Sequence, residues 1–204
     1  MISLIMSYLL GSISFSVLLA KMLKGIDIRQ HGSGNAGATN TLRILGKGPA
    51  IVVLCLDVLK GIIAVWLGKW LGGDTAWIPA LCGIAAIIGH NWPLYFHFRG
   101  GKGVATTIGV MVTLGFLPAL IAGIIAILSI VVTRYVSLGS LIFVGLTPVV
   151  MLLLGGYPWP TFWSSLVIAI FVFWRHRTNI VKMVQHRENK IGSGGSSKGG
   201  KRVV

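Results

Sequence analysis

The sequence predicts an all-α protein, a polytopic bundle of about seven transmembrane helices. Of its 204 residues, 54% are apolar and only 11% are charged, whereas a soluble globular domain has about 25% charged residues. The apolar residues form long runs, and nearly all Lys and Arg residues lie between these runs. Lipid is therefore the expected solvent for most of the chain.

Seven apolar runs can be followed along the chain. They cover residues 2–22, 49–71, 76–96, 103–117, 119–133, 138–154 and 160–174. The first run is followed by a motif-rich loop without a small-residue cleavage site, so we expect it to be a span and not a secretion signal. Pro118 separates the fourth and fifth runs, and each is shorter than the roughly 20 residues that usually cross a bilayer. A single kinked or discontinuous segment is therefore the alternative for these two runs.

The positions of the basic residues predict an orientation. With an odd number of spans, every one of the 18 Lys and Arg residues falls on one side except Lys60, inside a run, and Lys69, on the other side. The positive-inside rule then places the amino terminus outside and the carboxyl terminus in the cytoplasm, as for a bacterial inner-membrane protein. The opposite side carries an aromatic belt, formed by Trp66, Trp70, Trp77, Trp159 and Trp163. We expect one integral-membrane domain over residues 1–190 and a flexible basic tail over 191–204.

The formal charge of +14 constrains the partners of the chain. A nucleic-acid binder would spread its cations over polar surface, whereas here they sit between apolar runs, so no nucleic acid is expected. Membrane lipids and anionic substrates are the expected partners, and no obligatory protein partner is evident. With four carboxylates in all, and with Cys55 and Cys82 inside apolar runs, neither a metal site nor a cofactor is expected.

The loop after the first run, Gly32 to Arg43, is rich in glycine, hydroxyl and amide groups. Its glycines satisfy G-x-G-x-x-G, but that dinucleotide fingerprint needs a βαβ unit, and this loop lies between two spans. Exposed backbone N–H groups with Ser, Thr and Arg donors suit a phosphate group. The candidate ligands are Ser33, Gly34, Asn35, Thr39, Asn40 and Arg43. A flexible loop without a ligand is the alternative.

The second run contains two ionisable residues, Asp57 and Lys60. They are three residues apart and so lie on one helix face. A charge at mid-bilayer costs at least about 2.5 kcal/mol, so each needs a partner or a wet cavity. The pair either neutralises itself and holds two helices together or faces a site formed by the flanking loops.

The link from His90 to Gly103 combines a His, an Arg, a Lys and several glycines. Its Gly100-Gly101-Lys102-Gly103 segment fails the Walker pattern, because Gly103 stands where Ser or Thr is needed. If a helix begins at Val104, the glycines lie at its amino terminus, where free N–H groups favour an anion. His90, near the end of an apolar run, is either a structural residue or part of this site.

Polar residues also follow the fifth and seventh runs, on the same predicted side of the membrane. Each group on its own is typical of membrane-interface anchors. Together with the two glycine-rich loops they place Lys, Arg, His, Ser and Asn side chains at one membrane face. The additional candidates for phosphate binding are Ser137, Ser140, His176 and Asn179.

These motifs resemble a known family, the bacterial acyl-phosphate-dependent glycerol-3-phosphate acyltransferases. The family pattern GSGNxGxTNxxR is matched by Gly32 to Arg43, DxxKG by Asp57 to Gly61, and a GHxxP segment followed by GGKG by Gly89 to Gly103. The resemblance extends in order to about Asn179. It implies transfer of a fatty acyl group from acyl phosphate to the 1-hydroxyl of glycerol 3-phosphate, giving lysophosphatidate and phosphate, with neither coenzyme A nor acyl carrier protein as donor.

On this resemblance we expect His90, Ser33 and Asp57 to be catalytic. The first loop and the Gly100, Gly101 and Gly103 amides would hold the acyl phosphate, and Arg43, Lys102 and Lys60 the glycerol 3-phosphate. Acyl phosphate is already activated, so positioning and charge stabilisation suffice without a covalent nucleophile. His90 is either a hydrogen-bond donor to a phosphate or the general base for the attacking hydroxyl, and a substrate phosphate oxygen is the other candidate for that proton.

Two other functional classes fit part of the pattern. A carrier or channel for phosphate or a phosphorylated solute would share the cationic loops, although the sequence has no detectable internal repeat. A non-enzymatic scaffold for anionic lipid would account for the basic tail but leaves the glycine-rich loops unexplained.

Overall fold

The computed structural model describes residues 1–192, and these residues form only helices, turns and loops. The helices are α1 (Ile2–Gly11), α2 (Phe15–Lys24), η1 (Ile28–Gln30), α3 (Ala38–Leu45), α4 (Lys47–Leu71), α5 (Trp77–Asn91), η2 (Leu94–Phe96), α6 (Val104–Leu114), α7 (Phe116–Thr133), α8 (Val136–Leu154), α9 (Trp159–Arg175) and α10 (Arg177–Val184). The all-α prediction is thus confirmed for the described part of the chain. The tail expected from residue 191 lies, apart from Ile191 and Gly192, outside it.

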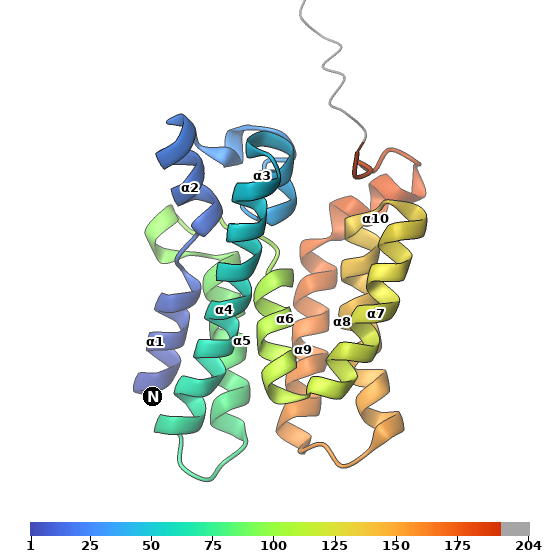
Figure 1. Cartoon of the computed structure of the whole chain (residues 1–204). Coiled ribbons are helices and arrows are strands. Elements are labelled where there is room, and N and C mark those ends of the chain that lie inside the picture. The colour runs from blue at the N-terminus through green and yellow to red at the C-terminus, as the bar shows by residue number, and fades with distance from the viewer. Residues whose placement is uncertain (193–204) are drawn as a thin grey trace, which may run out of the picture.

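The long helices run side by side and alternate in direction, with α3 and α10 at one end of the bundle (Figure 1). Among the described residues, four stretches are long and apolar enough to cross a membrane: Ile2–Lys24, Lys47–Leu71, Phe116–Thr133 and Val136–Leu154. The helices α5, α6 and α9 are shorter, with 15, 11 and 17 residues. The chain is therefore a membrane protein with helices of unequal length.

The predicted run boundaries are wrong at three places. The first run is not one helix, because the chain breaks between Gly11 and Phe15 into α1 and α2. The third run was predicted to reach residue 96, but its helix ends at Asn91, because Pro93 has no N–H to continue the helical hydrogen bonds. The fourth and fifth runs are two separate helices as predicted, but they meet at Gly115 and not at Pro118. They lie in opposite directions, so the single kinked segment is excluded (Figure 1).

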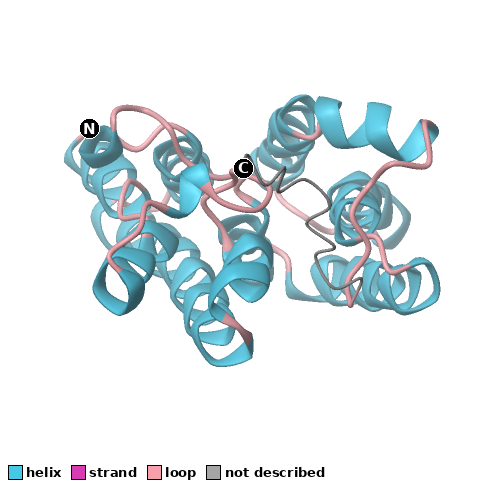
Figure 2. Ribbon diagram, turned by 90° about the horizontal axis from the view of Figure 1, so that it is seen from above, coloured by secondary structure: helices cyan, strands magenta, loops and turns pink. Residues whose placement is uncertain are grey.

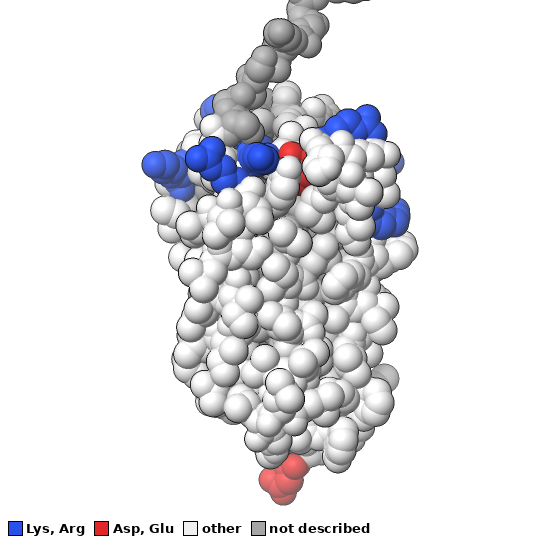
Figure 3. Space-filling view, turned by 90° about the vertical axis from the view of Figure 1, so that its right-hand side faces the viewer, with Lys and Arg blue, Asp and Glu red and all other residues white. Residues whose placement is uncertain are grey.

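Charge is distributed as a membrane protein requires. On the face drawn in Figure 3, the blue Lys and Arg side chains gather at the upper end and the long middle section has none. Large apolar side chains are exposed on the long helices, among them Val132 of α7 at 82% and Leu153 of α8 at 80%. The five Trp residues of the predicted belt are also all at least 44% exposed. This outward apolar surface is the one that lipid covers.

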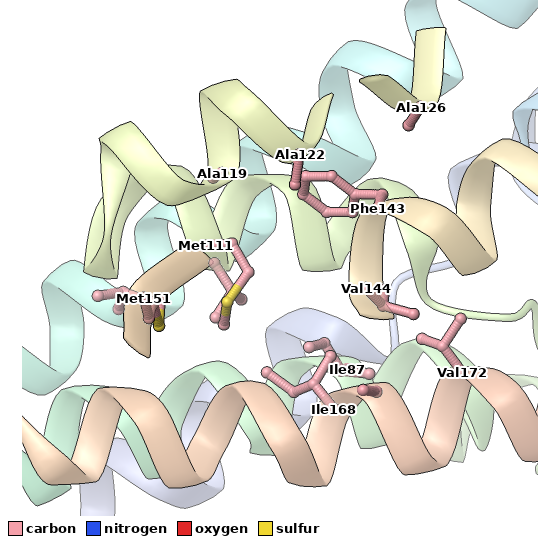
Figure 4. Close-up of a cluster of buried hydrophobic side chains, with 13 residues drawn as sticks. Ile87, Met111, Ala119, Ala122, Ala126, Phe143, Val144, Met151, Ile168 and Val172 are labelled. Atoms are coloured by element: carbon pink, nitrogen blue, oxygen red, sulfur yellow. The ribbon is translucent and has the colours of Figure 1, made fainter. Parts of the chain in front are cut away.

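The core between the helices is apolar and tightly packed. Met111 of α6, Phe143 of α8 and Ile168 of α9 meet in the main cluster, which Figure 4 draws with their neighbours. Helices α4 and α6 approach so closely that a Cβ on Gly109 would lie 2.0 Å from the Val58 carbonyl oxygen. Small residues allow such backbone contacts in membranes, and this one fixes the α4 segment that carries the buried charges.

Candidate active site

A cavity of about 980 Å³ opens at the charged end of the bundle. Seen from above, loops lie between the groups of helices (Figure 2). Most of the predicted site residues line the cavity: Ser33, Gly34, Asn35, Thr39, Asn40, Arg43, Asp57, His90, Gly100, Lys102, Gly103, Ser137, Ser140, His176 and Asn179. Two predicted residues, Lys60 and Gly101, do not line it. Residues far apart in sequence thus converge on one site.

The first glycine-rich loop is held in place by Asn40. Its side-chain amide donates to the carbonyls of Ile28 (3.1 Å) and His31 (3.0 Å), and its Oδ1 accepts from the Ser33 N–H at 2.9 Å. The amide nitrogen and oxygen of Asn40 therefore both form hydrogen bonds within the loop, so Asn40 positions the loop. Ser33 lies between Gly32 and Gly34, both of which have positive φ, so its exposed side chain stands at the tip of a tight turn.

The second glycine-rich loop packs directly on His90. The Gly101 N–H donates to the His90 carbonyl at 3.0 Å, and a Cβ on Gly101 would lie 2.1 Å from His90 Nε2. Gly101 therefore allows the loop to cross the imidazole, and its amide is already used. Gly103 has φ +80° and precedes α6, so a helix begins at Val104 as the sequence suggested.

Asp57, Lys60 and His90 form a buried cluster beneath the cavity. Asp57 and Lys60 are each 1% exposed, and His90 is 6% exposed. Lys60 Nζ lies 2.7 Å from Asp57 Oδ1, and the two groups form an ion pair without hydrogen-bond geometry. The same Nζ lies 2.9 Å from His90 Nδ1. Asp57 Oδ1 is 3.5 Å from the same His90 nitrogen. Asp57 thus contacts both Lys60 and His90, while the Lys60 ammonium lies behind them.

The cavity mouth carries an excess of positive charge. Lys102 Nζ donates to Asn179 Oδ1, and the Asn179 amide and the Ser137 hydroxyl donate to Glu188 Oε1 at 2.7 Å and 3.0 Å. Burial lowers the pKa of Lys102 to about 8, and nearby Arg and Lys side chains add to this while Glu188 opposes it. Lys102 is therefore a cation at neutral pH that would be more stable with an anion beside it.

His176 faces the same mouth as an uncharged side chain. Its Nδ1 lies 2.8 Å from the Val172 carbonyl oxygen, and because a carbonyl only accepts, Nδ1 carries the proton. Burial lowers the pKa of His176 to about 4, with Lys102 and Arg175 contributing in the same direction. At neutral pH Nε2 is therefore an unprotonated acceptor.

Below the mouth the cavity continues as an apolar shaft. Its walls come from α4, α6, α7 and α8, and include Leu54, Ile108, Ile124 and Phe143. The lining residues on α7 extend from Ala119 to Ile130, which is about 16 Å at the helical rise of 1.5 Å per residue. Ile124 and Leu54 are about half exposed. The shaft thus has the dimensions and surface that suit a lipid chain.

Arg175 and Glu188 belong to the site and were not among the predicted ligands. Arg175 donates to the Gly101 carbonyl through Nε (3.1 Å) and Nη2 (2.6 Å), and so ties α9 to the second glycine-rich loop. Glu188 accepts hydrogen bonds from the Asn179 amide and the Ser137 hydroxyl, and so lies beside Lys102 at the cavity mouth. In the sequence Arg175 directly follows the seventh apolar run, a position typical of a membrane-interface anchor. The one usable signal for Glu188 was its charge, since carboxylates are rare in this chain.

Comparison with known proteins finds relatives that match nearly the whole chain. The family model described as glycerol-3-phosphate acyltransferase matches residues 1–186. The glycerol-3-phosphate acyltransferase of Halalkalibacterium halodurans is 60% identical over 190 residues, covering 91% of this chain and 92% of that protein. The one from Thermoanaerobacter pseudethanolicus is 46% identical over 191 residues, covering 92% and 93%.

Solved structures are similar over nearly the whole chain as well. The crystal structure of PlsY, an integral membrane glycerol 3-phosphate acyltransferase, in its glycerol 3-phosphate form is 38% identical with a TM-score of 0.88, covering 94% of each chain. Its lysophosphatidic acid form is 37% identical with a TM-score of 0.86 and the same coverage. The chain therefore belongs to the family of integral membrane glycerol-3-phosphate acyltransferases.

Proposed function

We propose that this protein transfers a fatty acyl group from acyl phosphate to the 1-hydroxyl of glycerol 3-phosphate, giving lysophosphatidate and inorganic phosphate. The observation that carries the proposal is one cavity with a cationic mouth and an apolar shaft. The mouth suits two phosphate groups, and the shaft suits the acyl chain of a lipid donor. Neither feature alone would bring both substrates together.

In the proposed reaction the glycerol 3-phosphate hydroxyl attacks the acyl carbonyl carbon. A C–O ester bond forms, the bond from the carbonyl carbon to the phosphate oxygen breaks, and phosphate leaves with the electron pair, while the proton of the attacking hydroxyl passes to a substrate phosphate oxygen. Arg43 and Lys102 hold the glycerol 3-phosphate anion, and the first glycine-rich loop holds the phosphate of the donor. The chain contributes orientation and positive charge near the departing phosphate, which are the main requirements for an activated acyl donor.

The relatives support the choice of acceptor. One PlsY structure is described as a glycerol 3-phosphate form and another as a lysophosphatidic acid form. The cationic mouth of the present cavity suits the phosphate group that both ligands carry, and its apolar shaft suits the acyl chain of lysophosphatidic acid. The choice of acyl phosphate as donor comes from the sequence motifs.

We also propose seven membrane spans with the amino terminus outside and the cavity facing the cytoplasm of a bacterial inner membrane. The alternating directions of the helices support this number (Figure 1), and the clustering of basic side chains at one end supports this orientation. The short helices α5, α6 and α9 would cross a locally thinned or tilted region.

A donor-exchange assay tests the proposed reaction. The detergent-solubilised protein is incubated with radiolabelled glycerol 3-phosphate and either acyl phosphate or acyl coenzyme A. We expect a chloroform-soluble product with acyl phosphate only. Equal product with acyl coenzyme A contradicts the donor, and no product with either contradicts the acyltransferase and leaves the carrier, which uptake into proteoliposomes would detect.

The shaft is tested with the same assay at Gly123. This residue lines the shaft, and a Cβ there would meet only Phe143, at 4.0 Å. A Gly123→Leu side chain fills part of the shaft, so we expect kcat/KM for a long-chain acyl phosphate to fall about tenfold relative to a short-chain one. An unchanged ratio would place the acyl chain elsewhere.

A further inference from the structure

Lys60 is the one buried cation of the cluster that the cavity does not reach. Its ammonium donates to the carbonyls of Gly11 (3.1 Å) and Ile13 (3.0 Å). These carbonyls lie where α1 ends and before α2 begins, and the last carbonyls of a helix lack partners within it. At membrane depth no water is available to satisfy them. Two of the three Lys60 N–H groups thus close the gap between α1 and α2.

The remaining N–H group faces His90 Nδ1, 2.9 Å from Nζ. Asp57 Oδ1 lies 2.7 Å from Nζ as an ion pair. An ammonium has three donors and no acceptor. A proton on His90 Nδ1 would therefore point at an N–H group of Lys60, which is repulsive. The approach of 2.9 Å requires an unprotonated Nδ1, and a neutral imidazole then carries its proton on Nε2.

The opposite arrangement, with an uncharged Lys60 accepting from His90, fits the distances less well. Both amine protons would be used by Gly11 and Ile13, which would leave the Asp57 carboxylate paired only with an imidazolium 3.5 Å away. Asp57 instead lies closest to Lys60, at 2.7 Å.

We propose that Lys60 is a positioning residue that fixes the Nε2–H tautomer of His90. His90 lines the cavity, and its Nε2 lies against Gly101 of the second glycine-rich loop, so this tautomer places an N–H donor and not a base beside that loop. The same ammonium joins the α1–α2 gap to the imidazole, which couples the first membrane segment to the site. The kinetic consequence of this inference rests on the proposed function, whereas the tautomer itself does not.

The test uses the full chain with 15N-labelled histidine in detergent or bilayers. The chain has five His residues, and the signals of two are assigned by their loss in His90→Gln and His176→Gln. We expect His90 to have a protonated Nε2 and a bare Nδ1, and His176 to have the reverse pattern as an internal reference. A proton on His90 Nδ1, alone or together with Nε2, at neutral pH would overturn the inference. This result is independent of any acyltransferase activity.

Two variants add a kinetic readout. Lys60→Met removes the donors, so we expect a mixed His90 tautomer and a fall in kcat of about tenfold or more, as when an oriented donor is lost. The KM for glycerol 3-phosphate should stay within about twofold, because Lys60 does not line the cavity. Lys60→Arg keeps a cation with several donors and should recover part of kcat. An unchanged kcat in Lys60→Met overturns the positioning role, and if this variant fails to fold, the wild-type spectrum decides.

Discussion

His90 and His176 line the same cavity and are both buried, yet their surroundings differ. His90 lies against the Asp57–Lys60 pair, whose opposite charges meet at 2.7 Å. His176 lies at the mouth, where Lys102, Arg43 and Lys182 outweigh Glu188. The inner region thus balances its own charge, whereas the mouth has unbalanced positive charge. This difference indicates that inner charges orient groups and that outer charges bind anions.

The largest effect should come from unbalancing the inner region. In Asp57→Asn the Lys60 ammonium loses its counter-ion while remaining buried, so we expect the free energy of unfolding to fall by about 3–5 kcal/mol. A mixed-micelle denaturation titration measures it.

The matched control is Asp27→Asn, at an ion pair of the same 2.7 Å length with Arg29 but 20–29% exposed. This pair is partly exposed and screened by solvent, so the variant should lose much less stability than Asp57→Asn. Equal losses at the two sites would show that burial does not separate the two regions.

A smaller effect is expected from removing charge at the mouth. Lys102→Met deletes a charged donor to the substrate phosphate, which contributes about 1.5–3 kcal/mol, so the KM for glycerol 3-phosphate should rise roughly 10- to 100-fold. Steady-state kinetics measures it, and stability should change much less than in Asp57→Asn.

Lys69→Met is the control for this change. Lys69 lies near the far end of α4 and stacks 4.7 Å from the Trp66 ring centroid, away from the cavity. Its KM should match wild type. A loss of affinity in both variants would indicate a general effect of net charge.

The smallest effect is on pH dependence. Because the pKa of Lys102 is lowered to about 8, its charge is present below pH 8 and is lost as the pH rises through that value. A phosphate monoester is already close to a dianion at pH 7, so kcat/KM should fall above about pH 8, by at most tenfold per pH unit. In Lys102→Arg the side chain stays charged, and this decline should disappear. A decline that persists in that variant would assign it to another group.

The fold was predictable from the sequence where lipid decides it. Apolar runs and their basic flanks identified the long helices, because lipid selects continuous apolar segments. The break between α1 and α2 was missed, since Ser12 and Ser14 are tolerated in apolar runs and the Lys60 contact that stabilises the break comes from another helix.

The site was predictable as a set of residues but not as roles. Glycine-rich loops and charges within apolar runs are rare and therefore informative, and most of the predicted residues line the cavity. Asn40 illustrates the limit, because its amide fits a phosphate site equally well but is used within its own loop. Arg175 shows the converse, since only packing of α9 on the second loop brings it to the site.

The central claim is that cations from separate loops bind one substrate phosphate at the mouth. Solid-state NMR of the protein with 15N-labelled Lys and Arg side chains and bound glycerol 3-phosphate measures the couplings between 31P and 15N. The account predicts couplings to both Lys102 and Arg43, lost one at a time in Lys102→Met and Arg43→Met. A bound phosphate coupled to neither side chain would contradict it.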